Sequence, residues 1–450
     1  MSLRFLTGAA AIALIGAFAA ASPARAQQAA PAPAPEPAAP AHFVWNGITI
    51  SGHVDAGTTV NPDSPDNNIN FGQLFTDRAN SFRVNQTNIA AEQDIDSSAA
   101  SFNWGWRVEG MYGTDSRFTH TIGLFDRATN SPYQWDLVEA SLSGHFPVIF
   151  SGGIDVKAGN YPTPIGYEVI DANGNFFYTH SYIFNYGIPL KHTGAYAVGH
   201  VTDMIDVWAG ADTGVNAGAP FFRSTDDNHS GAFLGGFAIN NPIPNLTVLG
   251  LAHIGAENGY VAGGVGPAPD RNHYSRQIYD LVTTYKPLDA LTLANETNFI
   301  RDDLFHATAE GTAFYGIYKL NDQWSFGARG EVFRDDEGFF VASFQESQAF
   351  MNAERGIPVA SPIFGSGYNA GKATYSGLTI GANWTPAIPL PDALPSTLGL
   401  TIRPEFRWDH AWGLNPGVHP FGVTAASAAA GTVGTKDDQI LLSVDAIIAF

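Results

Sequence analysis

Charged side chains of opposite sign recur two residues apart at three places in the chain. They are Arg107 and Glu109, Arg329 and Glu331, and the series Arg403, Glu405, Arg407 and Asp409. In an extended strand, residues i and i+2 share a face, so each group presents both signs of charge on one side. Facing water in a lumen, such groups would create a transverse field that filters solutes by charge and dipole. Alternatively, the same pairs would cross-link an interior wall and only stabilise it.

The residues between these charges are apolar or proline. They are Val108, Gly330, Pro404, Phe406 and Trp408. A charge at the lipid midplane costs about 2–4 kcal/mol, so the charged face must point away from any lipid. Proline lacks the amide hydrogen that a strand ladder needs, and a closed barrel has no edge strand to hold it. We therefore expect a bulge at Pro404 or a place for it near the rim.

Signatures of catalysis and cofactor binding are absent from the sequence. Cysteine is absent, which excludes thiolate nucleophiles, disulfides, zinc–cysteine sites and iron–sulfur clusters. The HExxH, G-x-S-x-G, P-loop and Rossmann patterns do not occur, and the 13 histidines are scattered. Asx-rich stretches at 63–68 and 171–175 lack the spacing and terminal glutamate of an EF-hand, so we interpret them as turns. We expect no catalytic residue, no metal and no cofactor.

The composition is acidic and poor in charge. The 450 residues carry 22 Lys+Arg against 42 Asp+Glu, a net charge of −20. A nucleic-acid binder needs a basic stripe to neutralise phosphates, so we expect no nucleic-acid partner. Only 14% of the residues are charged, compared with roughly 25% in soluble domains.

The N-terminal region has the features of a targeting signal followed by a linker. Residues 1–26 have a basic start at Arg4, a short apolar stretch and a small-x-small cleavage site at 24–26, which are typical of a secretory signal peptide. Residues 27–42 are rich in proline and alanine and predict an extended periplasmic linker. Removal of Arg4 and Arg25 leaves 20 basic against 42 acidic residues, a net charge of −22.

Residues 43–450 alternate between apolar and polar side chains. Segments of about ten residues with period two are separated by Gly/Asn/Asp/Pro loops, which predicts about 16 strands, with a range of 14–18. The segments are 44–55, 81–95, 102–112, 134–146, 151–161, 192–202, 204–213, 231–240, 246–256, 274–286, 291–302, 309–320, 323–335, 374–386, 397–409 and 440–450. Tight turns are expected at 286–289 and 319–322. Long loops are expected at 56–80, 162–191, 214–230, 257–273, 336–373 and 410–437.

The alternation fits a soluble sandwich as well as a membrane barrel, and three features favour the barrel. Even the polar face is sparse in charge, and the last strand ends on Phe450. Tryptophans lie near segment ends on the apolar face, as an interfacial girdle requires: Trp104, Trp106, Trp208, Trp324 and Trp384. Lipid leaves no water for backbone groups, so a secreted chain of strands can span it only as a closed barrel. The predicted fold class is all-β, a transmembrane antiparallel barrel.

The segment 162–191 is too long for a turn and too aromatic for a disordered loop. Aromatic-rich loops avoid water unless they have a surface on which to pack. We expect this segment to fold into the lumen and constrict it. It would present Glu168, Asp171, His180 and Lys191. The alternative is an extracellular cap over the mouth of the barrel.

Several stretches resemble one family of outer-membrane proteins, the OmpL-like β-barrel porins of the porin-2 type. FNWGWRVEGMYGTDSRFT (102–119) and the stretch from Lys157 to Gly194 carry the strongest resemblance. GARGEVFRDDEGF (327–339), LTIRPEFRWDH (400–410) and the DAIIAF ending are similar as well. The resemblance implies a bacterial outer-membrane barrel that acts as a diffusion channel.

We therefore predict a non-enzymatic porin for passive diffusion of small hydrophilic solutes and ions. Arg83 joins Arg107, Arg329, Arg403 and Arg407 in tuning the lumen, opposed by the acidic partners named above. The net charge favours mild cation preference. Expected partners are outer-membrane lipid, the barrel assembly machinery through the strand ending in Phe450, and two further copies in a homo-trimer. The alternatives are a plugged structural or adhesive barrel, and an outer-membrane enzyme, for which no Ser/His pair is apparent.

Overall fold

The computed structural model describes residues 42–121, 124–125, 132–215, 230–256, 273–341, 371–387, 398–429 and 434–450. The predicted signal peptide and nearly all of the predicted linker lie outside the described residues. So do most of the predicted loops 214–230, 257–273 and 336–373.

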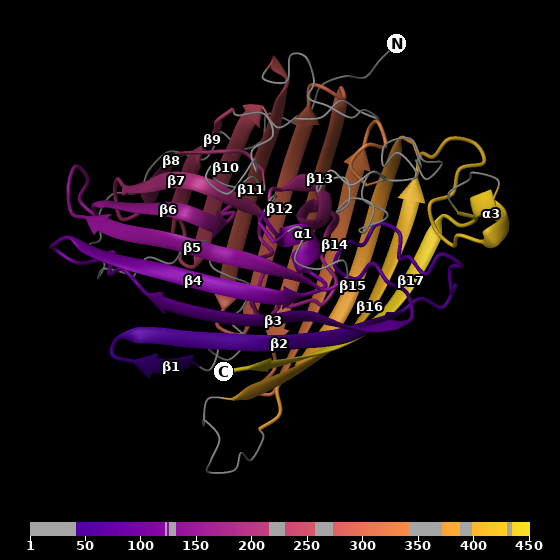
Figure 1. Cartoon of the computed structure of the whole chain (residues 1–450), viewed down its shortest axis with the longest axis horizontal. Coiled ribbons are helices and arrows are strands. Elements are labelled where there is room, and N and C mark those ends of the chain that lie inside the picture. The colour runs from indigo at the N-terminus through magenta and orange to yellow at the C-terminus, as the bar shows by residue number, and fades with distance from the viewer. Residues whose placement is uncertain are drawn as a thin grey trace.

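Sixteen antiparallel strands close into a barrel. Each strand from β2 to β17 pairs with its neighbours in the chain, and β17 pairs with β2 to close the ring. Figure 1 shows this continuous wall, with the short helix α1 (Ser116–Thr119) inside it. The predicted fold class and strand number are confirmed. Among the described residues, no helix is both long enough and apolar enough to cross a membrane.

The strands follow the alternating segments closely. Those of the first half are β1 (His42–Trp45), β2 (Ile48–Val60), β3 (Ser81–Gln93), β4 (Asn103–Gly113), β5 (Gln134–Phe146), β6 (Ile154–Pro162), β7 (Lys191–His200), β8 (Ile205–Asp212) and β9 (Ala232–Asn240). Those of the second half are β10 (Leu246–Ala256), β11 (Ser275–Leu288), β12 (Leu291–Asp302), β13 (Ala307–Lys319), β14 (Trp324–Asp335), β15 (Ala373–Trp384), β16 (Gly399–Trp412) and β17 (Asp438–Ala449). Beyond these, α3 covers Ala425–Ala429.

The first predicted strand is in fact a hairpin. Asn46 and Gly47 have φ of 51° and 82° and form the turn between β1 and β2. Both central residues of a type I′ turn need positive φ, which Asn-Gly tolerates best. β1 pairs with the first part of β2, and β17 pairs with the rest. Where the two meet, Phe450 and Gly52 exchange backbone hydrogen bonds of 2.9 and 3.0 Å.

Three other local predictions need correction. The loop predicted from residue 56 begins only after Val60, and the one predicted from residue 410 begins after Trp412. The tight turn predicted at 286–289 is displaced, because β11 runs to Leu288 through an irregularity and pairs there with Leu291.

Pro404 and Trp208 also differ from expectation. Pro404 lies within β16 without a bulge; instead, its pairing with β15 is interrupted between Glu405 and Ile402. That gap is where the missing amide hydrogen leaves the ladder unpaired. Trp208 shares the inward parity of Asp206 on β8 and stacks on Tyr196, with ring centroids 5.2 Å apart. It therefore belongs to the interior and not to the girdle.

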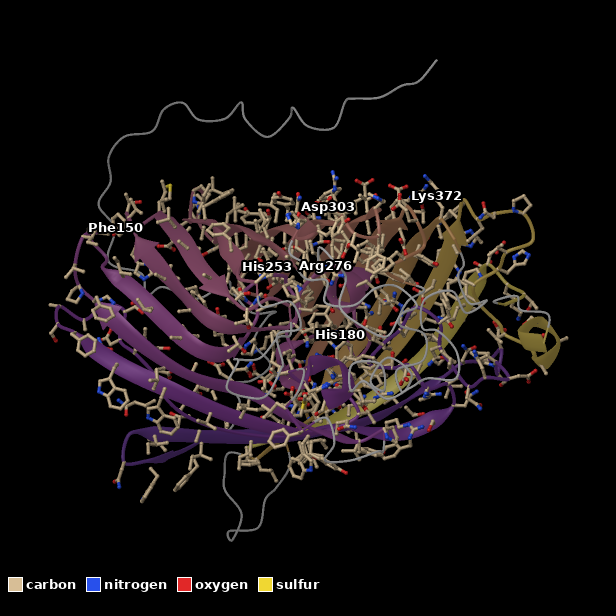
Figure 2. All side chains as sticks on the ribbon, turned by 45° about the horizontal axis from the view of Figure 1, so that its top comes forward. Phe150, His180, His253, Arg276, Asp303 and Lys372 are labelled. Carbon is tan, nitrogen blue, oxygen red and sulfur yellow. The ribbon has the colours of Figure 1, made fainter. Side chains whose placement is uncertain are left out.

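The barrel is filled over much of its interior. Figure 2 shows His180 inside the ring of strands. Buried apolar residues from the loop 61–80, from 163–190 and from the inner wall form one core. Among them are Phe71, Leu74, Phe75, Ile165, Tyr182, Phe184, Phe333 and Tyr375. The outer wall carries exposed apolar side chains, such as Phe82 and Phe314, which suits contact with lipid.

Candidate functional site

Residues 163–190, between β6 and β7, form a segment that lies inside the barrel, and we name it the lumen segment. It contains a 3₁₀ turn, η1 (Ala172–Gly174), and a π-helical turn, η2 (Ile183–Gly187). Most of its side chains are buried. An irregular segment makes no sheet ladder, so its buried backbone groups need other partners. Charged side chains of the wall supply many of them.

Arg329 on β14 joins two parts of the lumen segment. Its Nη1 donates to Oε1 of Glu168 at 2.7 Å and to the carbonyl oxygen of Thr179 at 2.8 Å. Its Nη2 donates to the hydroxyl of Thr179 and to that of Thr379 on β15, each at 3.2 Å. The Arg329 side chain is fully buried.

Arg403 on β16 holds the region of η1. Its Nε lies 3.0 Å from both carboxylate oxygens of Asp445, directly across on β17. Its Nη1 donates to the carbonyl oxygens of Ala172 at 2.9 Å and Asn175 at 2.7 Å. The Asp445 carboxylate orients the guanidinium of Arg403, and the guanidinium supplies hydrogen bonds to the carbonyl oxygens of the η1 turn.

Arg407, one step along β16, holds the next part of the segment. Its Nη1 donates to the carbonyl oxygen of His180 at 3.1 Å and lies 2.9 Å from Oε1 of Glu331. Its Nε donates to Asp409 at 2.9 Å. The guanidinium also lies over the ring of Tyr182, 5.3 Å from the centroid. This is a cation–π contact in a dry environment.

The wall carboxylates accept backbone N–H groups of the same segment. Glu405 accepts from Tyr178 at 2.9 Å and from Thr179 at 3.3 Å, and Glu331 accepts from Tyr182 at 2.6 Å. The arginines therefore satisfy carbonyl oxygens while the acids satisfy amides. These charged side chains of β14 and β16 therefore replace the hydrogen bonds that a sheet would have given to the segment's backbone.

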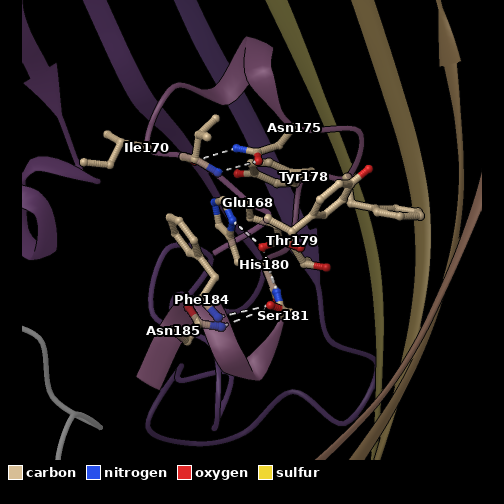
Figure 3. Close-up of polar contacts among 12 residues, drawn as sticks. Glu168, Ile170, Asn175, Tyr178, Thr179, His180, Ser181, Phe184 and Asn185 are labelled. Carbon is tan, nitrogen blue, oxygen red and sulfur yellow. Dashed lines mark hydrogen bonds and ion pairs between the residues drawn. The ribbon is translucent and has the colours of Figure 1, made fainter. Parts of the chain in front are cut away.

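Glu168 is the polar centre of the lumen segment, as Figure 3 shows. Its Oε2 lies 2.9 Å from Nδ1 of His180 and accepts the Ser181 N–H at 3.0 Å. Its Oε1 accepts from Arg329 and from the hydroxyl of Tyr315 at 3.1 Å. Burial opposes ionisation, but the Arg329 charge and the hydrogen bonds outweigh it and lower the pKa of Glu168 to about 2.

The other side of the lumen segment contacts β3. Gln86 donates to the carbonyl oxygen of Ile170 at 2.7 Å and accepts the N–H of Ala172 at 2.9 Å. Asn88 donates to Oδ1 of Asp171 at 3.1 Å. The segment is thus fixed to both sides of the barrel.

The loop 61–80 completes the filling. Phe75 contacts His180 with ring centroids 4.8 Å apart, and His180 stacks on Phe184 at 4.2 Å. Asp77 is held by Arg117 of α1 through contacts of 2.9 and 3.0 Å. Two loops and one short helix therefore occupy the interior together.

A second charged cluster lies on the inner faces of β3–β6 and is partly open. Arg107 contacts Glu109, Glu92 and Glu139, and lies 3.9 Å from Asp171 of the lumen segment; Lys157 contacts Glu139 at 2.8 Å. The side-chain exposures are 24% for Arg107, 29% for Asp171 and 30% for Lys157, compared with 0% for Arg329 and Arg407. We name this set the β3–β6 cluster.

This sequence matches the family described as putative beta-barrel porin-2, OmpL-like, over residues 47–450. The chain belongs to that family. It is therefore a porin of the bacterial outer membrane. Among curated proteins, no sequence matches this porin.

Solved structures show the same fold at low identity. The Pseudomonas putida OprB structure is 13% identical, covers 90% of this porin and 94% of its own chain, and has a TM-score of 0.51. The trimer form of Vibrio cholerae OmpT is 11% identical, covers 90% and 99%, and also scores 0.51. These likenesses concern the fold alone.

The remaining predicted site residues lie apart from these clusters. Lys191 is buried in the wall, where its Nζ contacts the Asp136 carboxylate and the carbonyl oxygen of Leu137. Arg83 is half-buried on the inner side of β3, and its Nε has no hydrogen-bond partner among the described residues.

The sequence analysis did not single out Gln86, Asn88 and Asp445. Gln86 and Asn88 bind the lumen segment directly, and Asp445 orients Arg403, which binds it. All three have inward parity on predicted strands, which was the only signal available. Asp77 lies in a loop and Arg117 in the short helix α1, both outside the alternating segments, where no periodicity exists to place them. The filtering role of the predicted residues stays a prediction.

Proposed function

We propose that solutes cross this porin beside the lumen segment, past the partly open charges of the β3–β6 cluster. The observation that carries this proposal is the contrast in exposure: Arg107, Asp171 and Lys157 remain partly open, whereas the inward-facing Arg329, Arg403 and Arg407 are covered. Charges that line a water-filled path act on solutes directly, and covered charges do not. The lumen segment would then form the constriction.

The proposed path prefers cations mildly. The β3–β6 cluster contains two cations, Arg107 and Lys157, and four carboxylates. Of the carboxylates, Glu92 and Asp171 are partly open, whereas Glu109 and Glu139 are buried and act on a solute only through the net potential of the cluster. An excess of fixed negative charge at a constriction raises the local concentration of cations.

We further infer that the porin acts without covalent chemistry and assembles as a trimer. The absence of catalytic motifs and the porin family support the first inference. The trimer form of V. cholerae OmpT supports the second by likeness of fold. Chemical cross-linking in native membranes would show a three-chain product if the trimer exists, and a monomer alone would contradict it. For Phe450, which closes the barrel against Gly52, we propose recognition by the barrel assembly machinery.

A plugged structural barrel is the second candidate function. The observation that favours it is the extent to which the lumen segment and the loop 61–80 fill the interior. Single-channel recording of the folded, mature porin in a planar bilayer, with a salt gradient, separates the two. The proposal predicts discrete ohmic steps and a reversal potential on the cation-selective side. Folded barrels that insert but remain silent would favour the plug.

A further inference from the structure

Three side chains from three strands meet at the inner wall, away from both charged clusters. They are His192 on β7, Asp212 on β8 and His253 on β10, and all three side chains are fully buried. Oδ2 of Asp212 lies 3.1 Å from Nδ1 of His192, and Oδ1 lies 3.0 Å from Nε2 of His253. Figure 2 places His253 on the wall. One oxygen or nitrogen from each residue lies within 4.8 Å of the others.

One of these two contacts lacks the geometry of a hydrogen bond. Among the described residues, neither Nδ1 of His192 nor Oδ2 of Asp212 has a hydrogen-bond partner, although they face each other. The other ring nitrogen of His192 lies 2.9 Å from the hydroxyl of Thr163. If that nitrogen donates its proton to Thr163, the neutral ring turns a lone pair toward a carboxylate. Two lone pairs in a buried site repel, and a cation between them removes the repulsion.

The surroundings provide further polar groups. Tyr161 is buried, its ring centroid lies 5.9 Å from that of His192, and its hydroxyl has no hydrogen-bond partner in the part of the chain that the structure describes. The rings of His192 and His253 are 4.9 Å apart. Gly214 donates its N–H to Oδ1 of Asp212 at 2.8 Å, which orients the carboxylate. Metal ligands are commonly fixed in this way by outer hydrogen bonds, and Thr163 has that place for His192.

We propose that His192, Asp212 and His253 bind one divalent transition-metal ion, with zinc as the natural occupant. Two imidazoles and one carboxylate are ligands that suit zinc and exclude calcium and magnesium, which take oxygen. Bonds of about 2.0–2.2 Å place neighbouring ligand atoms roughly 3.3 Å apart in a tetrahedron. The two observed nitrogen–oxygen separations, 3.1 and 3.0 Å, are of this size but run to different oxygens of Asp212, so the carboxylate would bind the ion through both oxygens.

The ion braces the root of the lumen segment. His192 lies two residues after Leu190, the last residue of the segment, and Thr163 is its first residue. The two ends are also joined by a hydrogen bond of 2.9 Å from the Thr163 N–H to the carbonyl oxygen of Leu190. An ion bound by β7, β8 and β10 therefore fixes the place where the segment enters and leaves the wall. This inference does not depend on the solute path.

Zinc content of the folded barrel tests the proposal. The mature chain is refolded in detergent with Zn²⁺ present, because the buried site must load during folding, and unbound metal is then removed by chelator and gel filtration. Heat-modifiable electrophoretic mobility selects folded protein. We expect one zinc per wild-type barrel by elemental analysis and none in His253→Gln. The matched control is His145→Gln, another buried wall histidine bonded to an aspartate, at 2.6 Å, which should retain the zinc.

Cobalt and Thr163 give a second readout. Co²⁺ bound by two imidazoles and a carboxylate in the wild type should give the visible absorption of a tetrahedral ion, and this absorption should be absent from His253→Gln. Thr163→Val, which leaves all three ligands intact, should weaken zinc affinity about 10- to 100-fold. Wild-type barrels that hold no more zinc than His253→Gln would overturn the proposal. If His253→Gln does not fold, wild-type barrels without stoichiometric zinc and without the cobalt absorption would overturn it equally.

Discussion

Two sides of the same interior wall carry alternating charges and use them differently. On β14–β17, Arg329, Arg403 and Arg407 are covered by the lumen segment and bind its carbonyl oxygens. On β3–β6, Arg107 and Lys157 are paired mainly with wall carboxylates and stay partly open. Both sides follow the same rule of parity. What separates them is the chain that lies against them.

The comparison shows that an inward charge becomes structural or functional according to its cover. A buried charge must be fully paired, because an uncompensated one costs several kcal/mol. Arg329, Arg403 and Arg407 meet that demand through ion pairs with carboxylates and hydrogen bonds to carbonyl oxygens of the irregular lumen segment. An open charge has water as an alternative partner and contributes little to stability. It is therefore free to act on solutes.

The largest expected effect is on single-channel conductance, when the part of the lumen segment that covers β14–β17 is removed. Replacement of residues 170–185 by a short Gly/Ser linker would remove the carbonyl oxygens that Arg403 and Arg407 bind and open the interior beside β14–β17. We expect a several-fold increase in single-channel conductance in barrels that still show heat-modifiable mobility. An unchanged conductance would sink the idea that the segment constricts the pore.

Removing the buried ion pair between Arg329 and Glu168 should lower the free energy of unfolding. Arg329→Met leaves Glu168 buried without its cation, which costs about 3–5 kcal/mol. The control is Arg301→Met, where the arginine is 54% exposed and paired with Asp303, and the expected loss is below about 1 kcal/mol. Equilibrium unfolding in denaturant measures both. Equal losses would contradict the contrast between covered and open charges.

Low pH should weaken the same ion pair between Arg329 and Glu168, because it protonates the Glu168 carboxylate. The pKa of Glu168 is lowered from its ordinary 4.5 to about 2, with burial opposing the shift and Arg329 and His180 producing it. Its contribution, about 3 kcal/mol, is therefore present above pH 4.5 and lost as the pH falls toward 2. Unfolding followed against pH should show a step in this window that is absent from Glu168→Gln. The same step in both proteins would assign it to other groups.

The smallest effect is expected on the open side. Asp171→Asn removes one of the partly exposed carboxylates, so the reversal potential in a salt gradient should move toward zero. Unfolding free energy should change by less than about 1 kcal/mol. Asp322→Asn, in a turn where that side chain is 97% exposed, is the matched control and should leave the reversal potential unchanged. A shift in the control alone would mean that the selectivity arises at the rim.

Alternation predicted the barrel but not its contents. Period two was sufficient to place Arg329 and Arg403 on the inner face, because lipid excludes charge from the other one. It carried no information on what would cover them, since the lumen segment has no period. For the loop 61–80 the sequence indicates only the Asx-rich turns at 63–68. The burial of this loop depends on Phe75, which packs on His180 and Phe184 of the segment, and on Phe71, which packs on Tyr375 of the wall.

The remaining misses have local or long-range causes. The Asn46-Gly47 turn carries its own signal, because this dipeptide is the strongest marker of a hairpin. His192, Asp212 and His253 lie on three strands far apart in sequence, and only the register of the sheet brings them together. Trp208 lies in the middle of β8 and points inward with Asp206, so the parity of the strand, and not the aromatic type of the residue, decides its side.

Cysteine accessibility tests the proposed path most directly, because the chain has no cysteine of its own. Ser143 is half-buried on β5 opposite Lys157, and Thr379 is buried on β15 beside Arg329. Ser143→Cys and Thr379→Cys are compared during single-channel recording with a charged, thiol-specific reagent. We predict that the reagent reduces the current of Ser143→Cys and leaves that of Thr379→Cys unchanged. Modification of Thr379→Cys, with Ser143→Cys unaffected, would contradict the account.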